Sequence, residues 1–320
     1  MVSQTAKMKT RILTSVLALA LLFSACSEGG GNTTPSSLVA GGDNTPAPEP
    51  APADVTQPEP TPEEINNTGN DQDNGFGEND DFQYEINNGE VTIMHYKGSD
   101  VAVEIPSQIE GKSVTSIGEI AFSGCTALTN IMIPDSVTSI GEYAFFDCWG
   151  LTDITIPNGV KSIGGVAFSG CMGLTNITIP DGVKSIGDDA FYNCMGLTDI
   201  TIPSGITSIG DRTFYGCTGL TTVTIPDGVT SIGKYAFSGC TALTNIMIPD
   251  SVTSIGSGDY AAIKKGWAVT AWSGAFGGCT SLEKAVYKGE NYSVNFVGQW
   301  TNGREQYDLP EEFYNAINGT

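Results

Sequence analysis

Apolar residues recur along most of the chain with a period of 23 residues, and polar residues fill the positions between them. A typical copy, residues 172–194, reads MGLTNITIPDGVKSIGDDAFYNC. Ile177 and Ile179 alternate with polar residues, which predicts a short strand with one buried face, ended by a Pro-Asp-Gly turn. Ile186 returns to the core, and the acids that open residues 188–191 predict one short helical or 3-10 turn. Each copy therefore supplies short strands and one tight turn.

Equivalent positions carry the same residue in successive copies. Cysteines lie 23 residues apart from Cys125 to Cys240, and Cys279 follows after 39 residues, which is one period plus 16 inserted residues. Two further series are the phenylalanines Phe122, Phe145, Phe168, Phe191, Phe214, Phe237 and Phe276, and the leucines Leu128, Leu151, Leu174, Leu197, Leu220, Leu243 and Leu282. A unit that cannot bury its own apolar face must stack on its neighbours. The repeat therefore predicts a solenoid of about eight coils that lie about 4.8 Å apart.

The repeat follows the pattern LxxIxIPxxVxxIGxxAFxxC over about residues 101–287, and residues 105–118 carry its lead-in, IP and later GKSVTSIG. In this pattern the chain resembles the BspA-like, treponemal type of leucine-rich repeat. The resemblance implies a right-handed leucine-rich repeat solenoid of the α/β class, built mostly of short parallel strands and displayed on a bacterial cell surface. Some members of that family act as adhesins for host matrix proteins or for other bacteria.

The repeats occupy residues 105–290 and would leave an open core at each end, which solenoids close with caps. Residues 82–104 contain alternating apolar positions such as Val91 and Ile93, which predict cap strands at the amino-terminal end. Residues 291–320 are rich in aromatic side chains and predict the cap at the other end.

Residues 1–26 are typical of a secretory leader. Three basic residues precede an apolar run of 12 residues, 12–23, which is too short to span a bilayer. The segment ends in SAC, which resembles a bacterial lipobox in which Cys26 carries the lipid; ordinary cleavage beside a spare cysteine is the alternative. Residues 27–81 are rich in Pro, Asn, Gly and acids and predict a disordered tether. The sequence leaves open whether the anchoring membrane is an outer or a cytoplasmic one.

Charge and chemistry exclude several function classes. The formal net charge is −22, which makes nucleic acid and anionic membrane surfaces poor partners. His95 is the one histidine, and the sequence contains no CxxC motif, nucleophile–base pair or phosphate-binding loop. We therefore expect no catalytic residues, no metal site and no cofactor.

The repeated cysteines allow two interpretations. An exported chain with many cysteines is often a disulfide framework. Here the cysteines occupy one equivalent position in stacked coils, so their Cβ vectors should be nearly parallel, which fits disulfide geometry poorly. Because free cysteine is also a small and commonly buried apolar residue, we expect a ladder of buried thiols.

A 16-residue insertion, 257–272, interrupts the last copy between its Ile-Gly corner and its Ala-Phe turn. Loops on a rigid scaffold often carry recognition. The candidate ligand-binding residues are therefore its aromatic and basic side chains, Tyr260, Lys264, Lys265, Trp267 and Trp272. The alternative is a hairpin that folds its aromatic rings back over the stack.

The positions that flank the central Ile of each strand are expected to face solvent. They are mostly small and polar, such as Asp153 and Thr155, and they lack the Trp, Tyr and Arg side chains typical of binding hot spots. Their repetition favours avidity towards a repetitive ligand, although a merely solvated face has the same pattern.

We interpret the chain as a lipid-anchored bacterial surface protein and not as an enzyme. It would bind an extracellular protein or glycan and mediate adhesion to host matrix, a host receptor or other bacteria. The alternative is a structural envelope protein that assembles with itself or packs on cell-wall glycans. The identity of residues 121–141 and 236–256 suits that alternative, because interchangeable copies are poorly suited to a site of individually tailored side chains.

Overall fold

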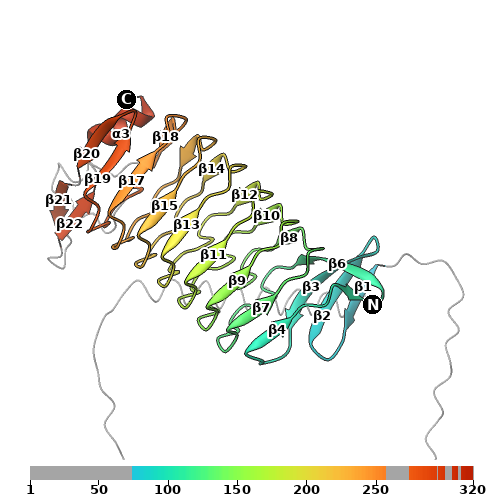
Figure 1. Cartoon of the computed structure of the whole chain (residues 1–320). Coiled ribbons are helices and arrows are strands. Elements are labelled where there is room, and N and C mark those ends of the chain that lie inside the picture. Colours follow the sequence, from blue (N-terminus) through green and yellow to red (C-terminus); the bar gives the residue numbers. More distant parts are fainter. Residues whose placement is uncertain (1–73, 257–273, 294, 300–304, 309–310, 320) are drawn as a thin grey trace, which may run out of the picture. The chain divides into compact units, whose positions relative to one another are not determined.

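The computed structural model describes residues 74–256, 274–293, 295–299, 305–308 and 311–319, all within one compact unit, Thr68–Thr320. The predicted leader, Cys26 and most of the predicted tether lie outside the described residues. The insertion 257–272 lies outside them as well. The described residues form coils that lie side by side along a stack (Figure 1).

One side of every coil is a strand of three or four residues. These strands are β4 (Ala102–Glu104), β7 (Asn130–Met132), β9 (Asp153–Thr155), β11 (Asn176–Thr178), β13 (Asp199–Thr201), β15 (Thr222–Thr224), β17 (Asn245–Ile248) and β19 (Lys284–Tyr287). They run parallel and in register, so that Ile154 of β9 pairs with Ile131 of β7 and with Ile177 of β11. Hydrogen bonding divides the row into three sheets, β11-β9-β7-β4, β13-β15 and β17-β19, and the last of these is extended by β20 (Glu290–Ser293).

A second side of the coils is made of Ser-Ile strands. These strands are β6 (Lys112–Ile117), β8 (Ser139–Ile140), β10 (Ser162–Ile163), β12 (Ser185–Ile186), β14 (Ser208–Ile209), β16 (Ser231–Ile232) and β18 (Ser254–Ile255). They pair in parallel as β6-β8-β10-β12 and β14-β16-β18, while β5 (Gln108–Ile109) pairs antiparallel with β6. The predicted parallel solenoid is thus confirmed, with seven coils that each contain one Phe of the series and β19 opening an eighth.

The third side of each coil is a turn rather than the expected helical turn. Its second residue after the corner glycine has a left-handed backbone, with φ of 57° at Asp189, 58° at Val166 and 58° at Tyr235. A left-handed residue cannot continue a right-handed helix. Its backbone N–H donates instead to the next coil, as in the 3.0 Å bond from the Asp189 N–H to the Asp211 carbonyl. The turn thus combines a hydrogen bond to the next coil with one of its own, from the Tyr192 N–H to the Asp189 carbonyl at 3.0 Å.

The corner glycines are required by the close approach of neighbouring coils. A Cβ built on Gly187 would lie 2.6 Å from the Gly165 Cα, and one built on Gly164 would lie 2.6 Å from the Gly141 carbonyl carbon. Real Cβ atoms do not approach backbone this closely, so a larger residue would wedge adjacent coils apart. Lack of space for a side chain, and not a positive φ, explains glycine at these corners.

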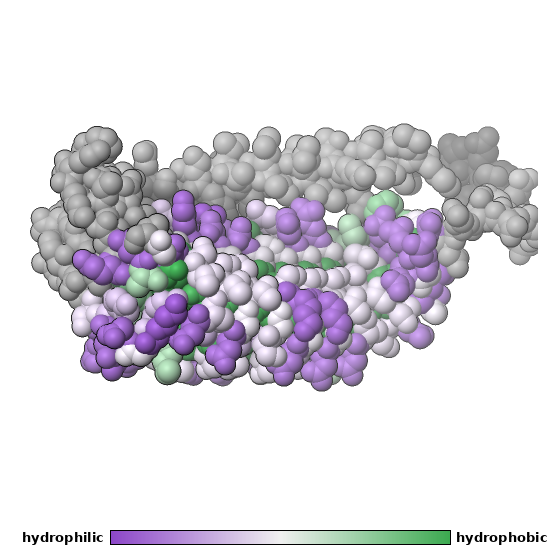
Figure 2. All heavy atoms as spheres, turned by 90° about the horizontal axis from the view of Figure 1, so that it is seen from above, coloured by the Kyte–Doolittle hydropathy of each residue, from purple (hydrophilic) through white to green (hydrophobic). Residues whose placement is uncertain are grey.

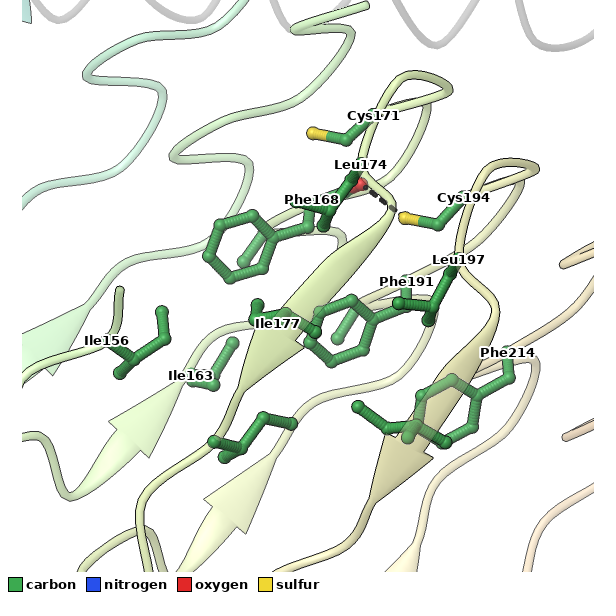
Figure 3. Close-up of a cluster of buried hydrophobic side chains, with 14 of the residues drawn as sticks. Ile156, Ile163, Phe168, Cys171, Leu174, Ile177, Phe191, Cys194, Leu197 and Phe214 are labelled. Atoms are coloured by element: carbon green, nitrogen blue, oxygen red, sulfur yellow. Dashed lines mark hydrogen bonds between the residues drawn. The ribbon is translucent and has the colours of Figure 1, made fainter. Parts of the chain in front are cut away.

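The core is a continuous stack of aromatic rings. Neighbouring Phe rings have centroids 5.2 to 5.5 Å apart and are inclined by 3 to 14° from Phe122 to Phe276. Figure 3 shows three of them, Phe168, Phe191 and Phe214, one behind another between the strand rows. All seven rings are at most 1% exposed, so the predicted inward stack is confirmed.

The repeated cysteines are free thiols, as expected, and six of the seven are buried. Each buried thiol donates to the backbone carbonyl of the Phe in the preceding coil, as the Cys194 thiol does to Phe168 at 3.1 Å (Figure 3). Burial raises the pKa of five of these thiols, those of Cys148, Cys171, Cys194, Cys217 and Cys240, and that of Cys217 to about 12. Because a buried thiolate would lack solvation, the thiols stay protonated and link neighbouring coils.

The amino-terminal end is covered by an antiparallel meander. Its strands are β1 (Gly75–Glu78), β2 (Phe82–Asn87) and β3 (Glu90–Tyr96), and β3 then pairs in parallel with β6. The rings of Phe82 and Tyr96 pack on Phe122, with centroids 6.4 and 5.4 Å away. They close the first ring of the stack.

The carboxyl-terminal end is closed by a different arrangement. It contains β20 (Glu290–Ser293), which is antiparallel to β19, the β21 (Asn295–Gln299) and β22 (Glu305–Asp308) pair, and the one α-helix among the described residues, α3 (Glu311–Asn318). Phe313 packs edge-on to Phe276, at 6.1 Å between centroids. The Asn318 side chain accepts from the Ile255 N–H at 2.7 Å and donates to its carbonyl at 2.9 Å. This amide thus satisfies backbone groups at the open edge of β18.

Candidate binding surfaces

The first strand row presents an exposed polar face, as its sequence predicts. In β9, Asp153 and Thr155 are exposed while Ile154 between them is buried, and β4, β7, β11 and β13 repeat this alternation. In β15 the central Val223 is half-buried. Two methionines interrupt the polar rows, with Met132 61% and Met247 73% exposed. They lie in the two identical copies and are separated by four coils of polar residues, so they form no patch together.

The turn side carries contacts that join coils. The Arg212 guanidinium donates two hydrogen bonds to the Asp189 carboxylate, at 2.7 and 2.8 Å. The rings of Tyr192 and Tyr215 stack at 4.9 Å between centroids. Hydrogen bonding to Asp189 raises the pKa of Arg212, which keeps the guanidinium charged. These four side chains thus contact one another across neighbouring coils.

An open groove of about 510 Å³ follows the second strand row. Small residues line it, including Ser208, Ser231 and Gly233, together with Asp211 and Lys234. The Ser231 hydroxyl donates to Ser208 at 2.8 Å, so the hydroxyls bond along the row. His95 lies in β3 beyond the other end of the row, and the described residues contain no cluster of metal-binding side chains. The lining of the groove contains neither a histidine nor a cysteine.

Sequence reasoning missed an exposed apolar row. The residue that directly follows the repeated cysteine is Trp149, Met172 or Met195 in three successive copies, and these are 52%, 42% and 40% exposed. The Trp149 carbonyl accepts from the Gly173 N–H at 3.1 Å, and the Met172 carbonyl from Gly196 at 3.0 Å, so the three residues lie on adjacent coils. We call Trp149, Met172 and Met195 the Trp–Met ridge.

A sequence signal for the ridge exists. The same position is threonine in the other copies, at Thr126, Thr218, Thr241 and Thr280. The fold therefore accepts a small polar residue there, and the large apolar side chains in the three middle copies are not required by packing. The described surface that faces the viewer in Figure 2 is mostly hydrophilic or of intermediate hydropathy, with few hydrophobic residues showing.

Two predicted sites lie outside the described residues. One is the lipid-attachment residue Cys26. The other is the set of candidate ligand-binding residues in the insertion, Tyr260, Lys264, Lys265, Trp267 and Trp272. Both stay predictions. Among the described residues, no helix has the length and apolar character to cross a membrane.

Known proteins share this fold and repeat. A leucine rich cell surface protein from Faecalibacterium prausnitzii A2-165 is 36% identical, with a TM-score of 0.60, over 73% of this chain and 60% of that chain. A T. pallidum leucine-rich repeat protein is 32% identical over 51% of this chain and 87% of that one, with a TM-score of 0.44. No curated protein matches.

This chain covers 60% of the length of the Faecalibacterium protein. The repeat itself matches the family described as BspA type leucine rich repeat region, in six copies over residues 102–217, 161–263 and 184–296. These matches span more than half of the chain and coincide with the stacked coils. The chain belongs to the BspA-type leucine-rich repeat family.

Proposed function

We propose that this chain is a bacterial cell-surface protein that binds another extracellular macromolecule, with adhesion to a host or to other bacteria as its role. The observation that carries the proposal is the Trp–Met ridge, three large exposed apolar side chains on adjacent coils of a packed scaffold. Aromatic residues and methionine are enriched at protein interfaces. Exposed apolar rows of this kind mark interaction sites.

Two further observations support display at the cell surface. The Faecalibacterium relative is described as a cell surface protein. The sequence of residues 1–26 is typical of a leader that ends at a lipidated cysteine, and Cys26 is the proposed anchor. The long tether that follows would hold the repeats away from the membrane.

A binding role fits the chemistry better than an enzymatic one. Leucine-rich repeat solenoids of this family typically serve as binding or structural scaffolds. The groove beside β14, β16 and β18 is open and lined by Ser, Gly, Asp and Lys side chains without a histidine. The insertion 257–272 is a second proposed determinant, because its lysines and tryptophans contrast with an acidic chain.

The proposal predicts saturable binding of the soluble chain, residues 27–320, to at least one member of a panel of extracellular matrix proteins and glycans. Surface plasmon resonance with the chain immobilised through its amino terminus measures the binding. Deletion of 257–272 should weaken binding at least several-fold without unfolding the coils, because it restores the 23-residue period of the other copies.

Met247→Thr provides the matched control, since it removes an exposed apolar side chain from the strand row and should leave affinity unchanged. Equal affinity of the deletion variant would remove the role assigned to the insertion. If no panel member binds and the chain instead assembles with itself in light scattering, the structural envelope role replaces the proposed one.

A further inference from the structure

Acidic residues lie close in sequence to the Trp–Met ridge, and their charge indicates which class of partner would bind there. Asp147 lies two residues before Trp149, and Asp153 and Asp199 open the strands that follow two of the ridge residues. Residues 147–155, 170–178 and 193–201 contain these three acids and neither Lys nor Arg. An apolar row bordered by carboxylates attracts cationic partners and repels anionic ones.

Local contacts hold the ridge and its acids in place. The Trp149 side chain donates a hydrogen bond to the Asp147 carboxylate. Asp153 pairs with Asn176 across β9 and β11, which fixes the spacing of the bordering side chains. Because the coils beneath are packed at 5.2 to 5.4 Å between Phe centroids, the ridge is a preformed surface.

We propose that the Trp–Met ridge is a docking surface for a basic segment of a partner protein that also carries apolar side chains. This inference rests on the proposed binding function and names the partner class of its main site. Arg or Lys side chains of the segment would lie over the Trp149 ring and pair with the bordering carboxylates. The flexible thioethers of Met172 and Met195 would adapt to its apolar side chains.

Charge argues against two other occupants. A second copy of this chain would bring another acidic ridge against the first, since the formal net charge is −22. An anionic lipid surface would be repelled by the same carboxylates. A basic protein segment gains from both the apolar row and its border.

The test uses residues 27–320 and a fluorescent 16-residue peptide that alternates Arg with Leu as the probe. Fluorescence anisotropy should show binding that weakens as salt rises, because the bordering carboxylates contribute. The triple variant Trp149→Thr, Met172→Thr, Met195→Thr should bind at least ten-fold more weakly. It should fold normally, since threonine occupies this position in other coils.

Three controls make the result specific. The variant Asp147→Asn, Asp153→Asn, Asp199→Asn should lose several-fold in affinity and most of the salt dependence. Met132→Thr should bind like the unchanged chain, because Met132 lies on the strand face outside the ridge. A peptide with Glu in place of Arg should not bind.

Undiminished binding by the folded triple threonine variant would overturn the assignment, as would equal binding of the Glu peptide. Stronger binding to zwitterionic lipid vesicles than to the Arg-Leu peptide would overturn it too. Failure of the proposed function can be told apart from failure of this inference. In the first case no extracellular protein or glycan of the panel binds, although the peptide still does.

Discussion

Stability should fall steeply as the pH rises from 8 to 10. Burial raises the pKa of five thiols, Cys148, Cys171, Cys194, Cys217 and Cys240, well above the ordinary value of 9.0. Above pH 9 the unfolded chain loses these protons while the folded chain keeps them, so ionisation favours the unfolded state. Between pH 8 and 10 each thiol lowers the free energy of unfolding by about 1.4 kcal/mol in total, and the five together lower it by about 7 kcal/mol.

The sign of this effect is fixed by the direction of the shifts. Below the unfolded pKa both states are protonated and stability does not depend on the thiols, while the loss continues up to the folded pKa, which is about 12 for Cys217. Urea unfolding at pH 7, 8, 9 and 10 under reducing conditions measures the slope. Cys217→Ser is the matched variant, and between pH 8 and 10 it should lose about 1.4 kcal/mol less than the unchanged chain. A free energy of unfolding that stays level from pH 8 to 10 would show that the thiols are solvated.

Replacing one ring in the middle of the stack should cost a large share of the stability. Phe191 is fully buried, and its ring lies 5.4 Å from Phe168 and 5.5 Å from Phe214. Phe191→Ala removes this packing and leaves a cavity, with an expected loss of about 3–5 kcal/mol. Chemical denaturation at pH 7 measures the loss.

Thr178→Ala is the control for that variant, since Thr178 is exposed on the strand row of the same coil. It should change the free energy of unfolding by about 0.5 kcal/mol or less. A loss below about 1 kcal/mol for Phe191→Ala would mean that the ring is not enclosed between its neighbours.

Features that depend on one repeat and its stacking were predictable from the sequence. Because every copy must bury the same residues, the inward positions of Phe191, Ile177 and Cys194 followed from their recurrence alone. Their burial is confirmed, as is the absence of disulfides among the described cysteines. The constant spacing of the cysteines predicts nearly parallel Cβ vectors, and this direction fits free thiols better than disulfides.

The turn side was predicted less well because neighbouring coils determine its backbone. Acids before an Ala-Phe pair are typical of a helix start, yet Asp189 takes φ of 57° and donates its N–H to the next coil. Even Val166, a β-branched residue that disfavours this region, takes the same backbone. The sequence of a single repeat does not predict such hydrogen bonds between coils.

The Trp–Met ridge was missed for a related reason. Exposure of Trp149 depends on the direction in which the turn after the cysteine points, and the repeat pattern assigns that position no face. Comparing copies would have shown large apolar residues where Thr218 and Thr241 stand elsewhere. The insertion residues stay a prediction, since they lie outside the described residues.

Both functional proposals require that the repeats be displayed outside the cell, and one measurement tests this most directly. An antibody raised against residues 102–296 is applied to intact bacteria that produce the chain, before and after treatment with an external protease. The account predicts labelling of intact cells that the protease removes. Labelling that appears only after the cells are lysed would contradict it.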